Sequence, residues 1–107
     1  MNATLSEYIQ QHDALLVLFG APTCHVCSDI KPHLFAAIKA AYPIMQTHYV
    51  NCNDDTQTCA QRGIFSLPAV HVYLQGQKFI EKGRVFSISA LIEELERPMR
   101  LMQSEQP

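Results

Sequence analysis

The chain has 107 residues, which is enough for one domain of ordinary size and too few for two. Apolar residues make up 48% and charged residues 17%, a balance typical of a globular core and not of a disordered or fibrous chain. The formal net charge of −2, with no basic run and no glycine-rich phosphate loop, argues against nucleic acid as a partner.

The first two predicted elements are a short helix and a buried strand. Thr4 or Ser6 can cap a helix that ends near His12. The continuous apolar run at 14–19, followed by Gly-Ala-Pro, is typical of a central, parallel strand buried on both faces. This run is far shorter than the ~20 apolar residues of a membrane helix. Because the first eleven residues also lack the basic start of a signal peptide, we expect a cytoplasmic protein with no membrane contact.

Two helices with a strand between them are predicted next. Apolar residues recur at helical spacing from Cys24 to about Ala41, in a long helix that Pro32 interrupts. Residues 45–52 alternate enough to form a strand, and a turn leads from it into a short helix over 56–61. Cys24 therefore opens the long helix just after the buried strand.

The C-terminal part predicts a hairpin and a last helix. Residues 68–74 and 78–82 are expected to form two strands joined across Gln-Gly-Gln. Ser87 or Ser89 can cap the final helix, which ends or bends at Pro98.

The order of these elements indicates the fold class. Helix, strand, helix, strand, helix, strand, strand and helix give an α/β sandwich with a mixed sheet, in which parallel crossovers come before one antiparallel hairpin. We expect a single domain over 1–107, with its core at 4–97 and a frayed tail at 98–107.

Two cysteines spaced by two residues, Cys24 and Cys27, carry the chemistry. Unpaired N–H groups and the helix dipole favour a thiolate at a helix N-terminus, so Cys24 is placed to attack a disulfide. Cys27, one turn further on, can then resolve the mixed disulfide. His25 lowers the pKa of the Cys24 thiol if its imidazolium lies close by, and is otherwise an exposed side chain. The pattern predicts a thiol–disulfide redox pair.

The other possible ligands and thiols point to no second chemistry. Cys52 and Cys59 are expected to be buried structural thiols, although a regulatory disulfide between them stays open. Zinc would need two close ligand pairs, and this second pair is not a Cys-X-X-Cys, so neither a metal nor a cofactor is expected. Three histidines lack the spacing of a triad or metal site and are expected at or near the surface: His33, His48 and His71.

Residues 19–27, Phe-Gly-Ala-Pro-Thr-Cys-His-Val-Cys, resemble the active-site segment of the thioredoxins, as does Pro32 five residues later. Residues 62–70, Arg-Gly-Ile-Phe-Ser-Leu-Pro-Ala-Val, are similar to the segment around that family's cis-proline. The resemblance implies a three-layer sandwich with a cis Leu67–Pro68 bond against the cysteine pair, and a Leu67 backbone that pairs with an extended substrate segment. With no room for the family's extra N-terminal strand, four strands and four helices are expected.

The sequence departs from the thioredoxin pattern around the cysteines. Thr23 stands where a Trp is usual, and His25 and Val26 replace Gly-Pro between the cysteines. His25 and Val26 are therefore expected to tune the reduction potential of the pair. Leu18 occupies the place of a buried Asp that helps to move protons off the resolving thiol, and Tyr49 stands where a Lys often lies. Without that acid, water or His25 would have to serve.

The resemblance implies a function in cell redox homeostasis. The chain would be a monomeric thiol–disulfide oxidoreductase acting on protein disulfides, with electrons from a thioredoxin reductase or another dithiol protein. Two alternatives stay open: a binding module that holds a peptide or partner in the Pro68 groove with little turnover, and a protein that binds a metal or an iron–sulfur cluster.

Overall fold

The structure is a computed structural model that describes residues 4–84 and 86–104. Its elements follow the predicted order, with bounds close to those expected from the sequence: α1 (Leu5–Gln11), β1 (Ala14–Gly20), α2 (His25–Ala41), β2 (Gln46–Asn51), α3 (Thr56–Gln61), β3 (Ala69–Leu74), β4 (Gln77–Gly83) and α4 (Ile88–Ser104). Thr4 caps α1, since its side chain accepts a hydrogen bond from the Glu7 N–H at 3.2 Å.

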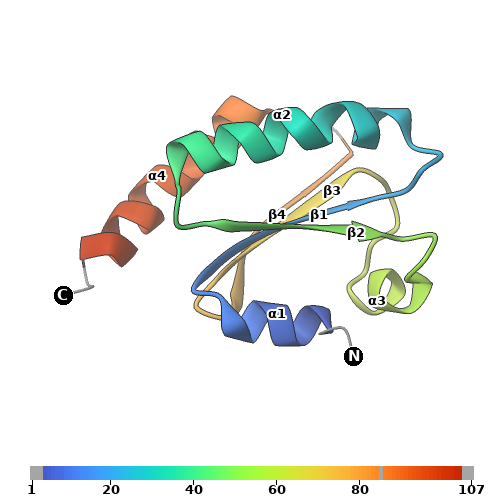
Figure 1. The fold of residues 1–107 in the computed structure, drawn as a ribbon, viewed down its shortest axis with the longest axis horizontal. Helices are drawn as coiled ribbons and strands as arrows, with labels where there is room; N and C mark the ends of the chain where they lie inside the picture. The colour runs from blue at the N-terminus through green and yellow to red at the C-terminus, as the bar shows by residue number, and fades with distance from the viewer. Residues whose placement is uncertain (1–3, 85, 105–107) are drawn as a thin grey trace.

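The elements form three layers, with α2 and α4 on one face of the sheet and α1 and α3 on the other (Figure 1). The strand order is β2-β1-β3-β4, which confirms the predicted mixed four-stranded sheet. Only the β1–β2 pair is parallel, because β3 runs antiparallel to both β1 and β4. The expected series of parallel crossovers is therefore a single one, and β1 is parallel to its neighbour on one side only.

All seven residues of β1 are buried, because helices cover both faces of the sheet at this strand. Successive side chains point to opposite faces. One set, which includes Leu16 and Leu18, packs with α2 and α4, where it meets Leu34 of α2. The other set packs with α1 and α3 and includes Val17 and Phe19. The strand is thus fixed from both sides, and so is the loop that leaves its end toward Cys24.

Two prolines, Pro32 and Pro98, lie inside helices of the structure, although the sequence predicted an interruption at the first and an end or a bend at the second. The interruption expected at Pro32 is wrong, because α2 continues through it and buries Leu34 and Ile38 completely on the far side. The sequence predicted that the last helix ends or bends at Pro98; an end there is wrong, because α4 continues to Ser104 and buries Met99 and Met102, and a bend stays a prediction.

A proline inside a helix costs about 3 kcal/mol, whereas burying a methionine side chain contributes roughly 1.5–3 kcal/mol. The two methionines of α4 therefore offset Pro98, and most of the expected frayed tail is helix; its last three residues, 105–107, lie outside the described part of the chain. Within that described part, no helix is both long and apolar enough to cross a membrane.

Candidate active site

Cys24 and Cys27 form a disulfide at the N-terminus of α2, with their Cα atoms 5.3 Å apart. Cys24 is the N-cap residue, and its sulfur accepts a hydrogen bond from the Cys27 N–H at 3.2 Å. Its own N–H donates to the Ala21 carbonyl at 3.0 Å, which fixes the turn between β1 and α2. Cys24 is partly exposed and Cys27 is completely buried. The first sulfur can therefore meet an incoming disulfide, and the second can be reached only through the first.

The Leu67–Pro68 peptide bond, which precedes β3, is cis. Ala69 pairs with Phe19 across the sheet, so Pro68 lies beside the end of β1, where the chain turns toward Cys24. The Pro68 carbonyl accepts a hydrogen bond from the Arg84 N–H at 2.8 Å. Pro68 is buried and Leu67 is half-buried, so the structure brings the predicted substrate-positioning pair to the same end of the sheet as the cysteines.

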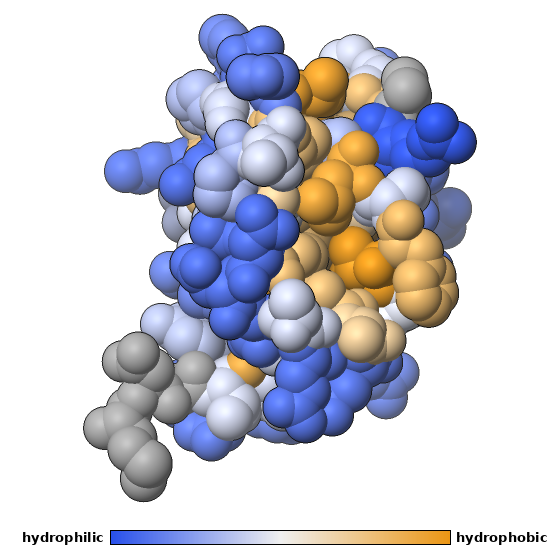
Figure 2. Space-filling view, turned by 90° about the vertical axis from the view of Figure 1, so that its right-hand side faces the viewer, coloured by the Kyte–Doolittle hydropathy of each residue, from blue (hydrophilic) through white to orange (hydrophobic). Residues whose placement is uncertain are grey.

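Apolar side chains gather at this end of the molecule, with polar residues around them (Figure 2). Val26, between the two cysteines, is 57% exposed, and Phe65, three residues before Pro68, is 91% exposed. An apolar patch with a polar rim is typical of a surface that contacts another molecule. His25 is exposed as well and makes no hydrogen bond or ion pair within the described residues, so nothing in the structure couples it to Cys24.

Gly20, the last residue of β1, lies behind the cysteine pair. A Cβ built on it would be 2.7 Å from the Tyr49 hydroxyl oxygen and 3.0 Å from the Cys27 Cβ, so only glycine leaves both neighbours in place. Lys31, on α2, holds its Nζ 4.5 Å from the centre of the Tyr49 ring. Sequence reasoning noted Tyr49 but missed Lys31, although its position four residues after Cys27 places the two on one helix face.

Cys52 and Cys59 form a second disulfide, with their Cα atoms 5.7 Å apart. The expectation of two unpaired buried thiols is wrong: the turn between β2 and α3 brings the residues to a Cα separation that a disulfide spans, the alternative left open above, and only Cys59 is buried. The Cys52 N–H donates to the Gly20 carbonyl at 2.8 Å, and the Cys59 carbonyl accepts from the Ile64 N–H at 2.9 Å. This disulfide is thus joined through the backbone to both segments that form the site.

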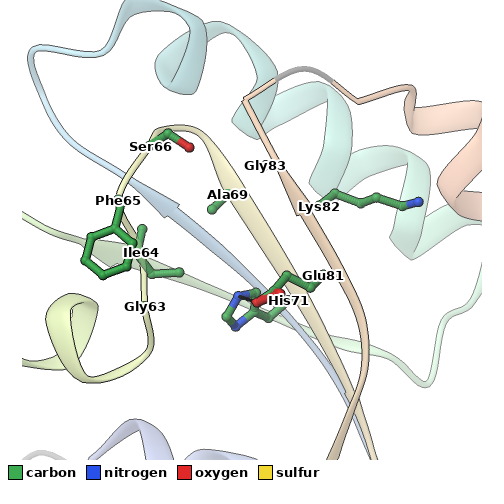
Figure 3. A pocket seen from close by; sticks show the side chains of 9 residues that line it. All are labelled: Gly63, Ile64, Phe65, Ser66, Ala69, His71, Glu81, Lys82 and Gly83. Carbon is green, nitrogen blue, oxygen red and sulfur yellow. Dashed lines mark ion pairs between the residues drawn. The ribbon is translucent and has the colours of Figure 1, made fainter.

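His71 is buried, at 1% exposure, on the α1–α3 face of the sheet, which corrects the expectation of a surface or half-buried side chain. Its Nδ1 lies 3.0 Å from the Tyr73 hydroxyl and its Nε2 lies 3.1 Å from a Glu81 carboxylate oxygen. It also lines a cavity of about 330 Å³ between the Phe65 loop and β4 (Figure 3). Both ring nitrogens have partners, so the histidine holds β3 and β4 together rather than serving the cysteine pair.

The other two histidines that were expected at or near the surface are His48 and His33. His48 stacks on Tyr8, with ring centres 4.5 Å apart, and burial lowers the pKa of His48. His33 is exposed on α2. The described residues contain no group of three or more His, Cys, Asp or Glu side chains that could hold a metal ion.

The free energy of unfolding is expected to fall on acidification because of His71. Burial is the main cause that lowers its pKa; the charges of Lys78 and Arg62 lower it further, and Glu81 opposes them. A histidine with a lowered folded-state pKa binds a proton more readily when unfolded, so stability is lost as the pH drops below the unfolded pKa of about 6.5. The loss is at most about 1.4 kcal/mol per pH unit from one group.

Urea denaturation between pH 7.5 and pH 5 measures this slope. A His71→Gln variant should show a smaller slope than the wild type, and His33→Gln, at an exposed position, should keep the wild-type slope. Equal slopes for His71→Gln and wild type would show that another group causes the acid sensitivity.

A mixed four-stranded sheet between two helical layers, with a Cys-X-X-Cys disulfide at the start of α2, defines a class of protein: the thiol–disulfide oxidoreductases built on the thioredoxin fold. The family profile described as Thioredoxin matches residues 1–97, so the chain belongs to the thioredoxin family. Its activity is accordingly that of a thiol–disulfide oxidoreductase.

Two curated relatives illustrate the range of the match. The thioredoxin-like protein YdfQ of Bacillus subtilis (strain 168) is 22% identical over 102 residues, which cover 95% of this chain and 90% of the relative. A protein disulfide-isomerase of Saccharomyces cerevisiae is 27% identical over 74 residues, which cover 65% of this chain and only 14% of that protein. The first likeness therefore spans nearly whole chains, and the second a small part of a much longer one.

Solved thioredoxin structures share the fold. The oxidised thioredoxin of Plasmodium falciparum superposes with a TM-score of 0.76 at 22% identity, over 92% of this chain and 93% of that one. A mutant thioredoxin of Halobacterium salinarum superposes with a TM-score of 0.77 at 16% identity, over 91% and 84% of the two chains.

Proposed function

We propose that the chain exchanges disulfides of protein substrates, with Cys24 attacking and Cys27 resolving. The observation that carries this proposal is the difference in access between the two sulfurs: Cys24 is partly exposed at the helix N-terminus, and Cys27 is completely buried behind it. Backbone N–H groups and the helix dipole stabilise a thiolate at the N-cap, and the thiolate is the attacking species. The Cys27 N–H already points at the Cys24 sulfur in the oxidised form.

Two exchange steps complete one turnover. The Cys24 thiolate attacks a substrate sulfur, the substrate S–S bond breaks, and one substrate sulfur leaves as a thiolate that takes a proton from water. The Cys27 thiolate then attacks the Cys24 sulfur, which forms the Cys24–Cys27 disulfide of this structure and releases the second substrate thiol. The chain has thus given two electrons to the substrate, and a thioredoxin reductase or another dithiol protein returns two electrons and restores both thiols.

The Leu67–Pro68 segment and the apolar patch support a peptide-like substrate. Leu67 is half-buried and lies at the same end of the sheet as the turn that leads to Cys24. It can offer its backbone N–H and C=O to an extended segment, as in strand addition. Val26, between the two cysteines, and Phe65, in the loop before Pro68, are both exposed and can give that segment apolar contacts. Val26 and His25 also occupy the positions that set the potential and the substrate preference of the pair.

A second candidate is a binding module that uses the same patch to hold a peptide without turnover. The exposed Phe65 favours this function, since an aromatic side chain that is 91% exposed can anchor a partner whether or not chemistry follows. The two candidates differ in one property: only an exchange protein forms a covalent adduct through Cys24.

A Cys27→Ser variant is expected to accumulate mixed disulfides in cell lysate, because Cys24 still attacks and no second thiol releases the substrate. Non-reducing electrophoresis and mass spectrometry of the captured proteins measure the adducts. The matched control is Cys24→Ser, whose remaining thiol at Cys27 is buried and should capture nothing. Capture of proteins without a disulfide bond to Cys24 would support the binding module instead.

We also propose that the chain acts as a monomer in the cytoplasm. A reducing compartment keeps supplying the electrons that a catalytic dithiol uses in each turnover. Cell fractionation tests the compartment, and analytical ultracentrifugation tests the oligomeric state.

A further inference from the structure

Cys27 is completely buried, and this creates a chemical problem for the resolving step. The sulfur must lose its proton before it attacks Cys24, and a thiolate without solvent is costly unless a hydrogen-bond donor or a positive charge lies beside it. Leu18, at 0% exposure on the α2 face of β1, offers only an aliphatic side chain. His25 is exposed and has no contact that joins it to the pair within the described residues.

Tyr49 supplies a polar group at the right place. A Cβ built on Gly20 would lie 2.7 Å from the Tyr49 hydroxyl oxygen and 3.0 Å from the Cys27 Cβ, so both atoms border the same position. Gly20 therefore lets the hydroxyl approach the buried cysteine across the end of the strand. Among the residues that the structure describes, this hydroxyl has no hydrogen-bond partner, so its proton is available to a sulfur that is no longer held in the disulfide.

Lys31 adds a positive charge to the same cluster. It stands four residues after Cys27 on α2, hence one turn further along the same helix face. Its Nζ lies 4.5 Å from the centre of the Tyr49 ring, a cation–π distance that holds the ring and the ammonium together. The contact between Tyr49 and Lys31 joins two separate elements, β2 and α2, and the tyrosine hydroxyl lies beside the same Gly20 position as the Cys27 Cβ.

We propose that Tyr49 is a catalytic residue of the resolving step and that Lys31 is the positioning residue behind it; this rests on the proposed exchange function. When Cys27 gives its proton to water, the Tyr49 hydroxyl donates a hydrogen bond to the resulting thiolate. The ammonium of Lys31 adds a favourable charge and keeps the ring in place. The thiolate then attacks the Cys24 sulfur, the bond from Cys24 to the substrate sulfur breaks, and the substrate thiolate takes a proton from water.

The test separates attack from resolution in the reduced protein, with oxidised glutathione as the probe. Acid quenching followed by mass spectrometry counts the reduced form, the Cys24–glutathione adduct and the internal disulfide at each time. A Tyr49→Phe variant keeps the ring and loses the hydroxyl, so attack should stay within about twofold of wild type while resolution slows about tenfold. The rate–pH profile of resolution should also move to higher pH, which loss of packing alone would not produce.

Two further variants complete the design. Lys31→Met, at an exposed position, should slow resolution about threefold and keeps the test open if Tyr49→Phe does not fold. Tyr8→Phe removes a hydroxyl on the opposite face of the sheet and should resolve the adduct at the wild-type rate.

Each outcome decides the matter. Resolution at the wild-type rate and with the wild-type pH profile in Tyr49→Phe, or an equal loss in Tyr8→Phe, overturns the role of Tyr49 and leaves the exchange function standing. A wild-type protein that forms neither the Cys24–glutathione adduct nor the Cys24–Cys27 disulfide overturns the exchange function, and this role with it.

Discussion

Cys24→Ser is expected to reduce insulin no faster than dithiothreitol alone, a complete loss of the protein-dependent rate. A serine oxygen cannot form a disulfide with the substrate, and no other residue replaces it, because Cys27 is completely buried behind the first sulfur. The measurement is the turbidity of the precipitating insulin B chain, with wild type, variant and no protein run side by side. Equal rates for wild type and Cys24→Ser would refute the assignment of the active site.

The assay needs a control for reduction of the second disulfide. Dithiothreitol can reduce Cys52–Cys59 as well as the pair at the active site, so a loss of activity could come from a loosened α3. A Cys52→Ala/Cys59→Ala variant, which has no second disulfide to reduce, should keep a protein-dependent rate in the same assay. If this double variant were as inactive as Cys24→Ser, the loss of insulin reduction in Cys24→Ser could not be assigned to the missing nucleophile.

The sequence predicted the fold because each element carries its own local signals. The apolar run of β1 is bounded by Gly-Ala-Pro, Thr4 caps α1, and the hairpin turns at Gly76, where φ is +83°. The two cysteines could be assigned to the start of α2 for the same reason. What the local pattern could not predict is the outcome of remote packing, which carries α2 through Pro32 and α4 through Pro98.

The parts of the site that escaped prediction depend on register between distant strands. Leu18 pairs with Tyr49 across β1 and β2, and this register brings the tyrosine up to Gly20 and Cys27. His71 pairs with Glu81 across the hairpin, which explains how a buried imidazole finds a carboxylate. Neither pairing can be derived from spacing along the chain, since it depends on which residues of two strands lie opposite each other.

The Cys52–Cys59 pairing could not be derived either, because it depends on the turn between β2 and α3 rather than on the seven-residue separation. Once formed, it closes a loop that contains most of α3, a helix of six residues. A helix this short is not stable by itself, so it needs tertiary anchors. Those anchors are the disulfide, the Asp55 cap that accepts from the Thr58 N–H, and the bond from Ile64 to the Cys59 carbonyl.

Reducing the Cys52–Cys59 disulfide is expected to lower the free energy of unfolding by roughly 2.5 kcal/mol, the chain-entropy value for a closed loop of about eight residues. The experiment uses a Cys24→Ser/Cys27→Ser background, in which only the second disulfide remains. Guanidinium denaturation of the oxidised and reduced forms then compares two proteins of identical sequence that differ by one covalent bond. Side-chain packing and the active-site disulfide therefore do not enter the difference.

Amide hydrogen exchange on the same two samples shows which segments lose protection when the disulfide is reduced. If the disulfide anchors α3, reduction should expose the Cys59 and Ile64 amides and leave those of the central strand β1 protected until global unfolding. Equal denaturation midpoints in both forms would mean that the Asp55 cap and the backbone bonds hold α3 without the cross-link. The second pair would then be free to open and close without cost to the fold, a property suited to a redox-responsive pair and not to a structural one.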